Sequence, residues 1–175
     1  DIFTYDQQAC SSPTILLLFG RVSSELYERK LYTLLNIIDE SSRGIQSYMF
    51  SRHLEYFKGA ALLASNTKSL VAYKGTYLYC FWIKGISDLK SSVRSPGILA
   101  LGCIENFHDI KKFCSANLQT IVYVNGRGAA PEGLIDAAIR LPVSRVVSPG
   151  RALNMHLRWD GYDIIRVLSK QLCNE

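Results

Sequence analysis

The sequence lacks any apolar run long enough to cross a membrane. A membrane-spanning helix needs about 20 mostly apolar residues, and no stretch of the chain approaches that length. A basic segment followed by an apolar stretch, the mark of a signal peptide, is also missing. We therefore expect a cytoplasmic protein without a membrane span.

Paired cysteines are missing as well. The five cysteines are odd in number and show no C-x-x-C spacing, which argues against a disulfide framework and against a zinc site. Four of them lie in apolar or helical patterns and are expected to be small buried residues: Cys80, Cys103, Cys114 and Cys173. Cys10 differs, because it lies in a polar loop that runs from Asp6 to Pro13.

Charge of one sign is not concentrated in any part of the chain. Twenty Lys and Arg residues against fifteen Asp and Glu leave a net charge of +5, with no basic run longer than Lys111-Lys112. Proteins that bind nucleic acids usually gather their basic residues into a patch, so no nucleic-acid partner is expected. With 48% hydrophobic and 20% charged residues, the 175-residue chain has the composition of one folded globular domain.

Strand-like and helix-like segments alternate in the first half of the chain. Thr14–Phe19 is an apolar run of strand length, and residues 23–44 have apolar side chains at helical spacing. Residues 45–67 have a less regular helical pattern. A β-hairpin is expected between Ser69 and Trp82, with its turn at Lys74-Gly75.

The second half repeats one unit of strand and helix. Strands are expected at Ile98–Ile104, Gln119–Val124 and Arg145–Ser148, with helices of about ten residues between them at 106–116 and 131–141. Such alternation implies parallel strands joined by crossover helices. We therefore expect a three-layer α/β fold, with a mainly parallel sheet and helices on both faces.

Cys10 is the candidate nucleophile. A cysteine attacks a thioester only as its thiolate, which requires exposure and surroundings that stabilise the anion. The polar loop supplies exposure, and backbone amides with the side-chain amide of Gln7 or Gln8 can support negative charge on the attacked oxygen. From chemistry alone, a single loop cysteine is more often an ordinary residue than a catalytic one.

Other motifs favour structural interpretations. Gly126-Arg127-Gly128 follows an expected strand and precedes an expected helix, where a phosphate-binding turn would lie, but the third glycine of the dinucleotide motif is missing. A simple turn is the favoured interpretation. The three histidines lack the spacing of metal ligands, so no metal is expected. Asp160, in Trp159-Asp160-Gly161-Tyr162, is best explained as the cap of a closing helix.

Both ends of the chain resemble one family. The loop Gln7-Gln8-Ala9-Cys10-Ser11-Ser12-Pro13 is similar to the nucleophile loop of the long-chain acyl-CoA reductases, the fatty acid reductases of bacterial bioluminescence, in the aldehyde dehydrogenase superfamily. The tail resembles the C-terminal region of that family in four motifs: Leu118-Gln119-Thr120, Ser144-Arg145-Val146-Val147, Pro149-Gly150-Arg151-Ala152-Leu153 and Trp159-Asp160-Gly161-Tyr162-Asp163. Several motifs in the right order are more specific than one cysteine.

The resemblance implies a fold like the aldehyde dehydrogenase catalytic domain and an NADPH-dependent reduction of a long-chain fatty acyl thioester to an aldehyde. Cys10 would form the acyl-enzyme, which would accept a hydride and collapse to the fatty aldehyde. Gln8 would shape the loop, and the Cys10 backbone amide would form part of the oxyanion hole. The acyl donor would be acyl-CoA or an acyl-protein, with an acyl-protein synthetase and further copies of the chain as partners.

The chain also departs from the family pattern. The NADPH-binding domain that precedes the nucleophile in this superfamily, with its general-base Glu, is not found ahead of Cys10. Residues 1–175 are therefore expected to be the catalytic domain only, and to be inactive as a reductase alone. Residues 93–97 lack the acidic motif of ordinary aldehyde dehydrogenases, which favours acyl reduction over aldehyde oxidation. Two alternatives stay open: a non-catalytic docking or oligomerisation module, and a cysteine hydrolase.

Overall fold

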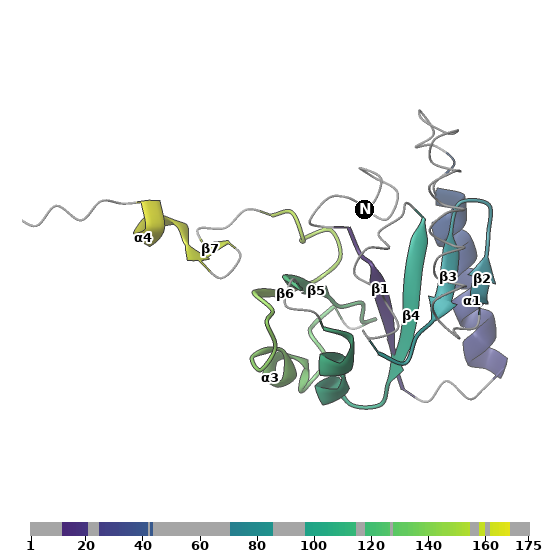
Figure 1. The fold of residues 1–175 in the computed structure, drawn as a ribbon, viewed down its shortest axis with the longest axis horizontal. Helices are drawn as coiled ribbons and strands as arrows, with labels where there is room; N and C mark the ends of the chain where they lie inside the picture. The colour runs from purple at the N-terminus through teal and green to yellow at the C-terminus, as the bar shows by residue number, and fades with distance from the viewer. Residues whose placement is uncertain are drawn as a thin grey trace, which may run out of the picture. The chain divides into compact units, whose positions relative to one another are not determined.

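The computed structural model of the protein contains both helices and strands (Figure 1). The described residues are 12–20, 25–41, 43, 71–85, 97–114, 118–126, 128–154, 158–159 and 162–168. The expected helical stretch at 45–67 lies outside them. Residue contacts divide the chain into two compact units, Asp1–Phe113 and Cys114–Glu175, and each is described by itself.

The first unit is built on a four-stranded sheet in the order β1-β4-β3-β2. Its strands are β1 (Ile15–Phe19), β2 (Val71–Lys74), β3 (Tyr79–Trp82) and β4 (Ile98–Ile104). β1 and β3 both pair parallel to β4, whereas β2 pairs antiparallel to β3. The predicted strands and the predicted hairpin are therefore confirmed, and the sheet is mostly parallel.

Helix α1 (Glu25–Ser41) packs its apolar side on one face of this sheet. Leu31 and Leu35 lie one helical turn apart on the same side, and both are buried. They belong to a cluster that takes in residues of all three strands β2, β3 and β4, among them Tyr73, Cys80 and Leu101. Burial of a large apolar side chain stabilises a fold by about 1.5–3 kcal/mol, so this cluster holds α1 against the sheet.

On the opposite face of the sheet, η4, a 3-10 helix (Phe107–Phe113), packs against β4 and β1. Neighbouring residues of a strand point to opposite faces. Leu101 of β4 joins the cluster under α1, whereas a Cβ placed on Gly102 would lie 2.6 Å from the ring of Phe113. Each face of the sheet thus carries a helix, although η4 is shorter and tighter than the helix expected at 106–116.

A buried carboxylate joins α1 to the β2–β3 hairpin. Asp39 is only 8% exposed. It accepts hydrogen bonds of 2.7–2.9 Å from three backbone N–H groups of the hairpin turn: Thr76, Tyr77 and Leu78. A Cβ on Gly75 would lie 2.5 Å from the Asp39 carboxylate. The turn can therefore approach this closely only with glycine at position 75.

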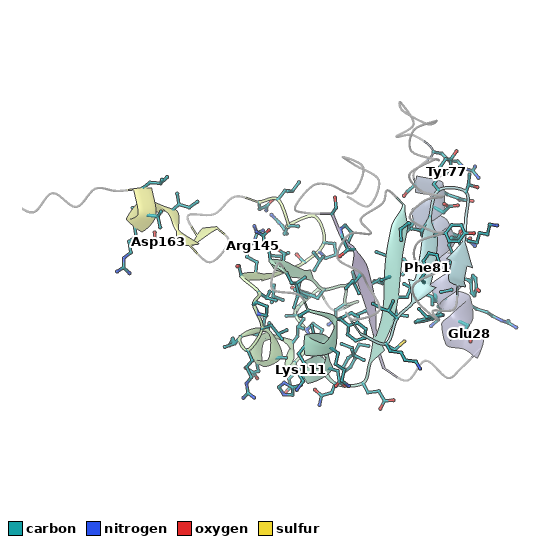
Figure 2. The ribbon with its side chains drawn as sticks, viewed as in Figure 1. Glu28, Tyr77, Phe81, Lys111, Arg145 and Asp163 are labelled. Carbon is teal, nitrogen blue, oxygen red and sulfur yellow. The ribbon has the colours of Figure 1, made fainter. Side chains whose placement is uncertain are left out.

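A second polar contact ties the same two elements together. The hydroxyl of Tyr73, in β2, donates a 2.7 Å hydrogen bond to Oδ1 of Asn36 in α1. The rings of Tyr73 and Tyr32 are tilted against each other, with 6.1 Å between their centroids. Figure 2 labels Tyr77, in the hairpin turn, and Phe81, in strand β3.

The second unit contains two parallel strands, β5 (Thr120–Val122) and β6 (Arg145–Val147), joined through helix α3 (Leu134–Ala138). They form a separate two-stranded sheet, so the prediction of one sheet through both halves of the chain is wrong. Thr120 lies opposite Arg145 in the register. The expected helix at 131–141 is thus present in a shorter form, with turns on both sides. Leu134, Ala137 and Ala138 are its buried residues.

The chain then forms a short antiparallel pair, β7 (Arg158–Trp159) and β8 (Tyr162–Asp163), followed by helix α4 (Ile164–Leu168). The carboxylate of Asp163 accepts a hydrogen bond from the backbone N–H of Arg166 at 3.1 Å, as a helix cap does. The sequence predicted Asp160 as the cap of this helix, but the helix begins at Ile164 and its cap is Asp163; Asp160 itself lies outside the described residues. Within the described ranges, no helix has the length and apolar character to cross a membrane.

Replacing Asp39 with alanine should destabilise the first unit by about 3 kcal/mol, because three amides of the hairpin turn would lose their acceptor in a buried place. Urea unfolding of both proteins measures this change. Glu40→Ala is the matched control, since the neighbouring Glu40 side chain is 66% exposed and should cost about 0.5 kcal/mol or less. Equal losses in the two variants would show that the Asp39 carboxylate does not hold the hairpin.

Candidate functional site

The residues predicted to carry the chemistry precede the described part of the chain. Cys10 and Gln8 both lie outside it, and the description begins at Ser12. The following segment is anchored, because the carbonyl of Thr14 accepts a 3.0 Å hydrogen bond from the backbone N–H of Ala100 in β4. The predicted nucleophile loop is thus attached, through its last residues, to the amino end of β1.

Ser12 is a polar feature of this loop that the sequence reasoning did not single out. Its Oγ is buried and has no hydrogen-bond partner among the described residues. A buried hydroxyl usually has a partner, and one without a partner calls for an explanation such as an ordered water, an ion, local strain or a catalytic role. Only a structure could reveal this signal, because serine in a polar loop is common.

Cys80 is buried, as predicted, and chemically inert. The residue is 0% exposed in strand β3. Burial, and secondarily the negative charge of Asp39, raise the pKa of the Cys80 thiol from 9.0 to about 12. The thiol is therefore protonated at neutral pH and cannot act as a nucleophile there.

The prediction that Cys103 is a buried core residue is wrong, because this residue is exposed. Cys103 shares a face of β4 with Leu101, two positions earlier. The buried residues of β4 on that face end at Leu101, so the strand continues beyond the cover that α1 provides. Partial burial still raises the pKa of the Cys103 thiol.

The remaining cysteines add no activated thiol to the described part of the structure. Cys114 is half-buried, and burial raises the pKa of its thiol too. Cys173 lies outside the described residues. A lowered pKa is what marks a reactive cysteine, and none of the three cysteines that the structure describes has one.

The described residues also include no group of three His, Cys, Asp or Glu side chains that could hold a metal ion. The polar contacts around η4 have a structural role instead. Asn106 accepts a hydrogen bond from the backbone N–H of His108 at 2.9 Å, at the start of the helix. Asp109 and Lys112 form a 2.8 Å ion pair one turn apart, and the hydrogen bond from Lys112 lowers the pKa of Asp109.

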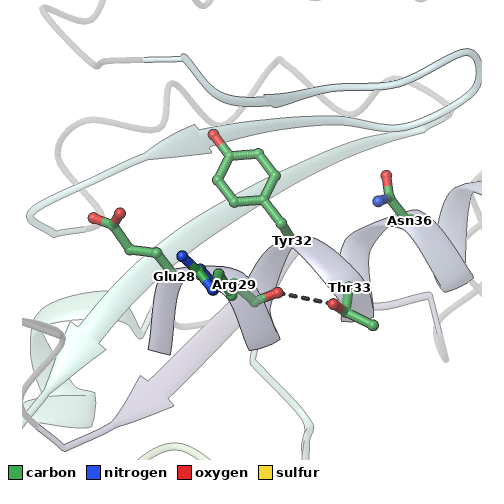
Figure 3. Close-up of a pocket in the computed structure, with 5 residues that line it drawn as sticks. All are labelled: Glu28, Arg29, Tyr32, Thr33 and Asn36. Atoms are coloured by element: carbon green, nitrogen blue, oxygen red, sulfur yellow. Dashed lines mark hydrogen bonds between the residues drawn. The ribbon is translucent and has the colours of Figure 1, made fainter. Parts of the chain in front are cut away.

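A shallow open depression lies on the surface of α1 (Figure 3). Its lining residues are Glu28, Arg29, Tyr32, Thr33 and Asn36. The hydroxyl of Thr33 already donates to the carbonyl oxygen of Arg29 at 2.9 Å, and Asn36 already accepts from Tyr73. The depression contains no nucleophile and none of the residues predicted from the sequence, so it does not identify a reaction.

The glycine turn after β5 is present where it was predicted, between a strand and a helix. The N–H of Gly128 donates to the carbonyl of Asn125 at 3.1 Å, and the Asn125 side chain donates to the carbonyl of Ala129, also at 3.1 Å. Gly128 has a φ of 74°, which favours glycine. Arg127 lies outside the described residues.

No protein-family model, curated protein or solved structure matches the chain. Among the described residues, the buried Cys80 thiol is protonated at neutral pH, and the Ser12 hydroxyl, two residues after Cys10 in the sequence, has no hydrogen-bond partner.

Thiol labelling should separate the described cysteines by burial. With an alkylating reagent at neutral pH, Cys103 should label slowly in the folded protein and faster as the pH rises, because its raised pKa limits the thiolate. Cys80 should label only after unfolding. Peptide mass mapping measures both. Cys103→Ala should remove the first signal and change stability by about 0.5 kcal/mol or less, as exposed substitutions do; rapid labelling of folded Cys80 would contradict its burial.

Alkaline conditions should weaken the first unit through Cys80. Its pKa is raised from 9.0 to about 12, so the folded state keeps a proton that the unfolded chain loses. This stabilisation is complete below about pH 9 and is lost as the pH rises through about 12. Urea unfolding at several alkaline pH values measures the decline. Cys80→Ala should start less stable, because it leaves a cavity, but should decline less; an equal decline would contradict the assignment.

Proposed function

We propose that this chain carries the nucleophile of a long-chain acyl thioester reductase and that Cys10 forms the acyl-enzyme. The observation that carries the proposal is the loop Gln7–Pro13, which resembles the nucleophile loop of the acyl-CoA reductases. The four tail motifs, in the family's order, support it. The parent activity would be NADPH-dependent formation of a fatty aldehyde from acyl-CoA or an acyl-protein.

The chemical step assigned to this chain is acyl transfer. The Cys10 thiolate attacks the carbonyl carbon of the thioester, the bond from that carbon to the donor sulfur breaks, and the donor leaves as a thiolate that takes up a proton. Gln8 would shape the loop. The Cys10 backbone amide would donate to the oxygen that becomes negative in the transition state. The Ser12 hydroxyl, buried and without a described partner, is a further donor in the same loop.

The described residues do not fit a complete NADPH site. The glycine turn after β5 has Pro131 where the dinucleotide motif has its third glycine. The helix that follows, α3, has only five residues. We therefore assign no step of the reduction to residues of this chain, and the resemblance places the cofactor in a separate NADPH-binding domain.

The pKa values of the described cysteines support Cys10 as the acyl acceptor. Thioester attack needs a thiolate at neutral pH. Burial raises the pKa of all three thiols that the structure describes. A polar loop is a more suitable setting, because solvent and backbone amides stabilise the anion there.

A non-catalytic docking or oligomerisation module is the second candidate. Two exposed apolar side chains favour it: Ile37, in α1, is 60% exposed, and Ile139, just after α3, is 77% exposed. Single exposed apolar residues are common on ordinary surfaces, so these support the second candidate less than the loop supports the first. In a docking module, Cys10 would be no more reactive than Cys103.

Incubating the chain with a long-chain acyl-CoA should place an acyl group on Cys10, because it is the candidate thiolate in a polar loop. Intact mass and peptide mapping locate the adduct. Cys10→Ala should abolish it, whereas Cys103→Ala, which removes the exposed competing thiol, should leave it unchanged. An adduct on Cys103 with Cys10 free, or equal slow acylation of both, would overturn the proposal and favour the docking module.

A further inference from the structure

The carboxyl ends of β5 and β6 bring two loops to the same edge of the second unit. The strands are parallel, and a 3.0 Å hydrogen bond from the N–H of Tyr123 to the carbonyl of Val147 continues their pairing to the last residues. The chain after each strand therefore leaves at one edge. We call the described residues of these segments, 124–126, 128–130 and 148–154, the carboxyl-edge loops. Ligands of α/β proteins commonly bind at the carboxyl ends of parallel strands.

Both carboxyl-edge loops have open glycines. A Cβ placed on Gly126, Gly128 or Gly150 would meet no atom within 4 Å. Gly150 has a φ of 78° in a turn closed by the N–H of Arg151, which donates to the carbonyl of Ser148 at 3.2 Å. Among the described residues, no hydrogen bond from the N–H of Gly126 or Gly150 is found. A ligand can therefore approach the backbone of both loops closely.

The carboxyl-edge loops are also positively charged. The guanidinium of Arg145 donates to the carbonyls of Arg151 and Ala152 at 3.1 and 2.7 Å, and so holds the second loop against β6. The Arg151 side chain is exposed and forms no ion pair with a described residue. Residues 118–131 and 142–159 include no Asp or Glu. No acidic residue within either segment therefore offsets this charge.

We propose that the carboxyl-edge loops bind a phosphate or diphosphate group. The negatively charged oxygens of a phosphate group point in several directions, so they match a set of backbone amides and one arginine better than the oxygens of a single carboxylate do. The amides of Gly126 and Gly150 donate to the phosphate oxygens, and Arg151 supplies the positive charge. Arg145 acts as a positioning residue, because it fixes the loop that carries Arg151. The proposal is independent of acyl transfer by Cys10.

The test is calorimetric titration of the chain with inorganic diphosphate and, separately, with adenosine diphosphate at low ionic strength, where electrostatic binding is least screened. Arg151→Gln should weaken binding about tenfold or more, since it removes a charge-assisted contact. Arg140→Gln is the matched control. Arg140 is exposed, carries the same charge and lies between the end of α3 and the start of β6, at the opposite edge of the unit. It should leave binding unchanged.

Gly126→Ala provides a second variant that should not disturb the fold, because its Cβ meets open space and its φ is not positive. Its melting temperature should match that of the unsubstituted chain, while its methyl group weakens phosphate binding. Equal affinity for both ligands would support a site for the diphosphate alone. Tighter binding of adenosine diphosphate, lost in Arg151→Gln, would support a nucleotide held through its phosphates. Absent binding, or equal loss in the two arginine variants, would overturn the proposal.

Discussion

The hydrogen bonds of the Asp39 carboxylate set the geometry of the first unit. They hold the turn of the β2–β3 hairpin against the last turns of α1, and β3 is in turn the parallel neighbour of β4. A carboxylate taken out of water is costly unless its oxygens are bonded, and a buried amide needs an acceptor. Each group here satisfies the other. Shifting the turn would break these three hydrogen bonds in a buried place, which favours one arrangement of the helix, the hairpin and the sheet.

The central strand β4 shows how the same constraint extends to the opposite face. Six of its seven residues are buried, as expected of a strand with parallel neighbours on both sides. On one face its side chains pack under α1. On the other face the ring of Phe113 occupies the place where a side chain at position 102 would lie, so glycine there lets η4 approach the sheet. Both helices are therefore positioned by β4. Leu101 packs under α1, and Gly102, which has no side chain, lets η4 approach.

Local patterns in the sequence predicted the strands well, because β1 and β4 are continuous apolar runs. Apolar side chains at helical spacing predicted α1, and Lys74-Gly75 between two strand-like runs predicted the hairpin turn. They did not reveal Asp39, which looks like one more acidic residue of a helix until the hairpin, 37 residues later, meets it. Cys103 was misplaced because an apolar run does not show where its cover ends. The carboxyl-edge loops lie at the same edge of the second unit because β5 and β6 pair in parallel, and no local sequence pattern specifies that pairing. Cys10 and Gln8 stay predictions, since they lie outside the described residues.

Burial assigns different chemistry to cysteines of the same chain. In β3, ionising Cys80 would place a second negative charge near Asp39 in a site without solvent, and both effects raise the pKa of the thiol. Burial, and secondarily the charge of the carboxylate that holds the hairpin, therefore keep the Cys80 thiol protonated at neutral pH. A thiol in a polar loop open to solvent would escape both effects, because water and backbone amides can stabilise a thiolate there. In the second unit, likewise, the proposed phosphate site lies in the loops that follow β5 and β6 and not in the strands themselves. Rigid elements that satisfy their own polar groups leave binding and reaction to the segments between them.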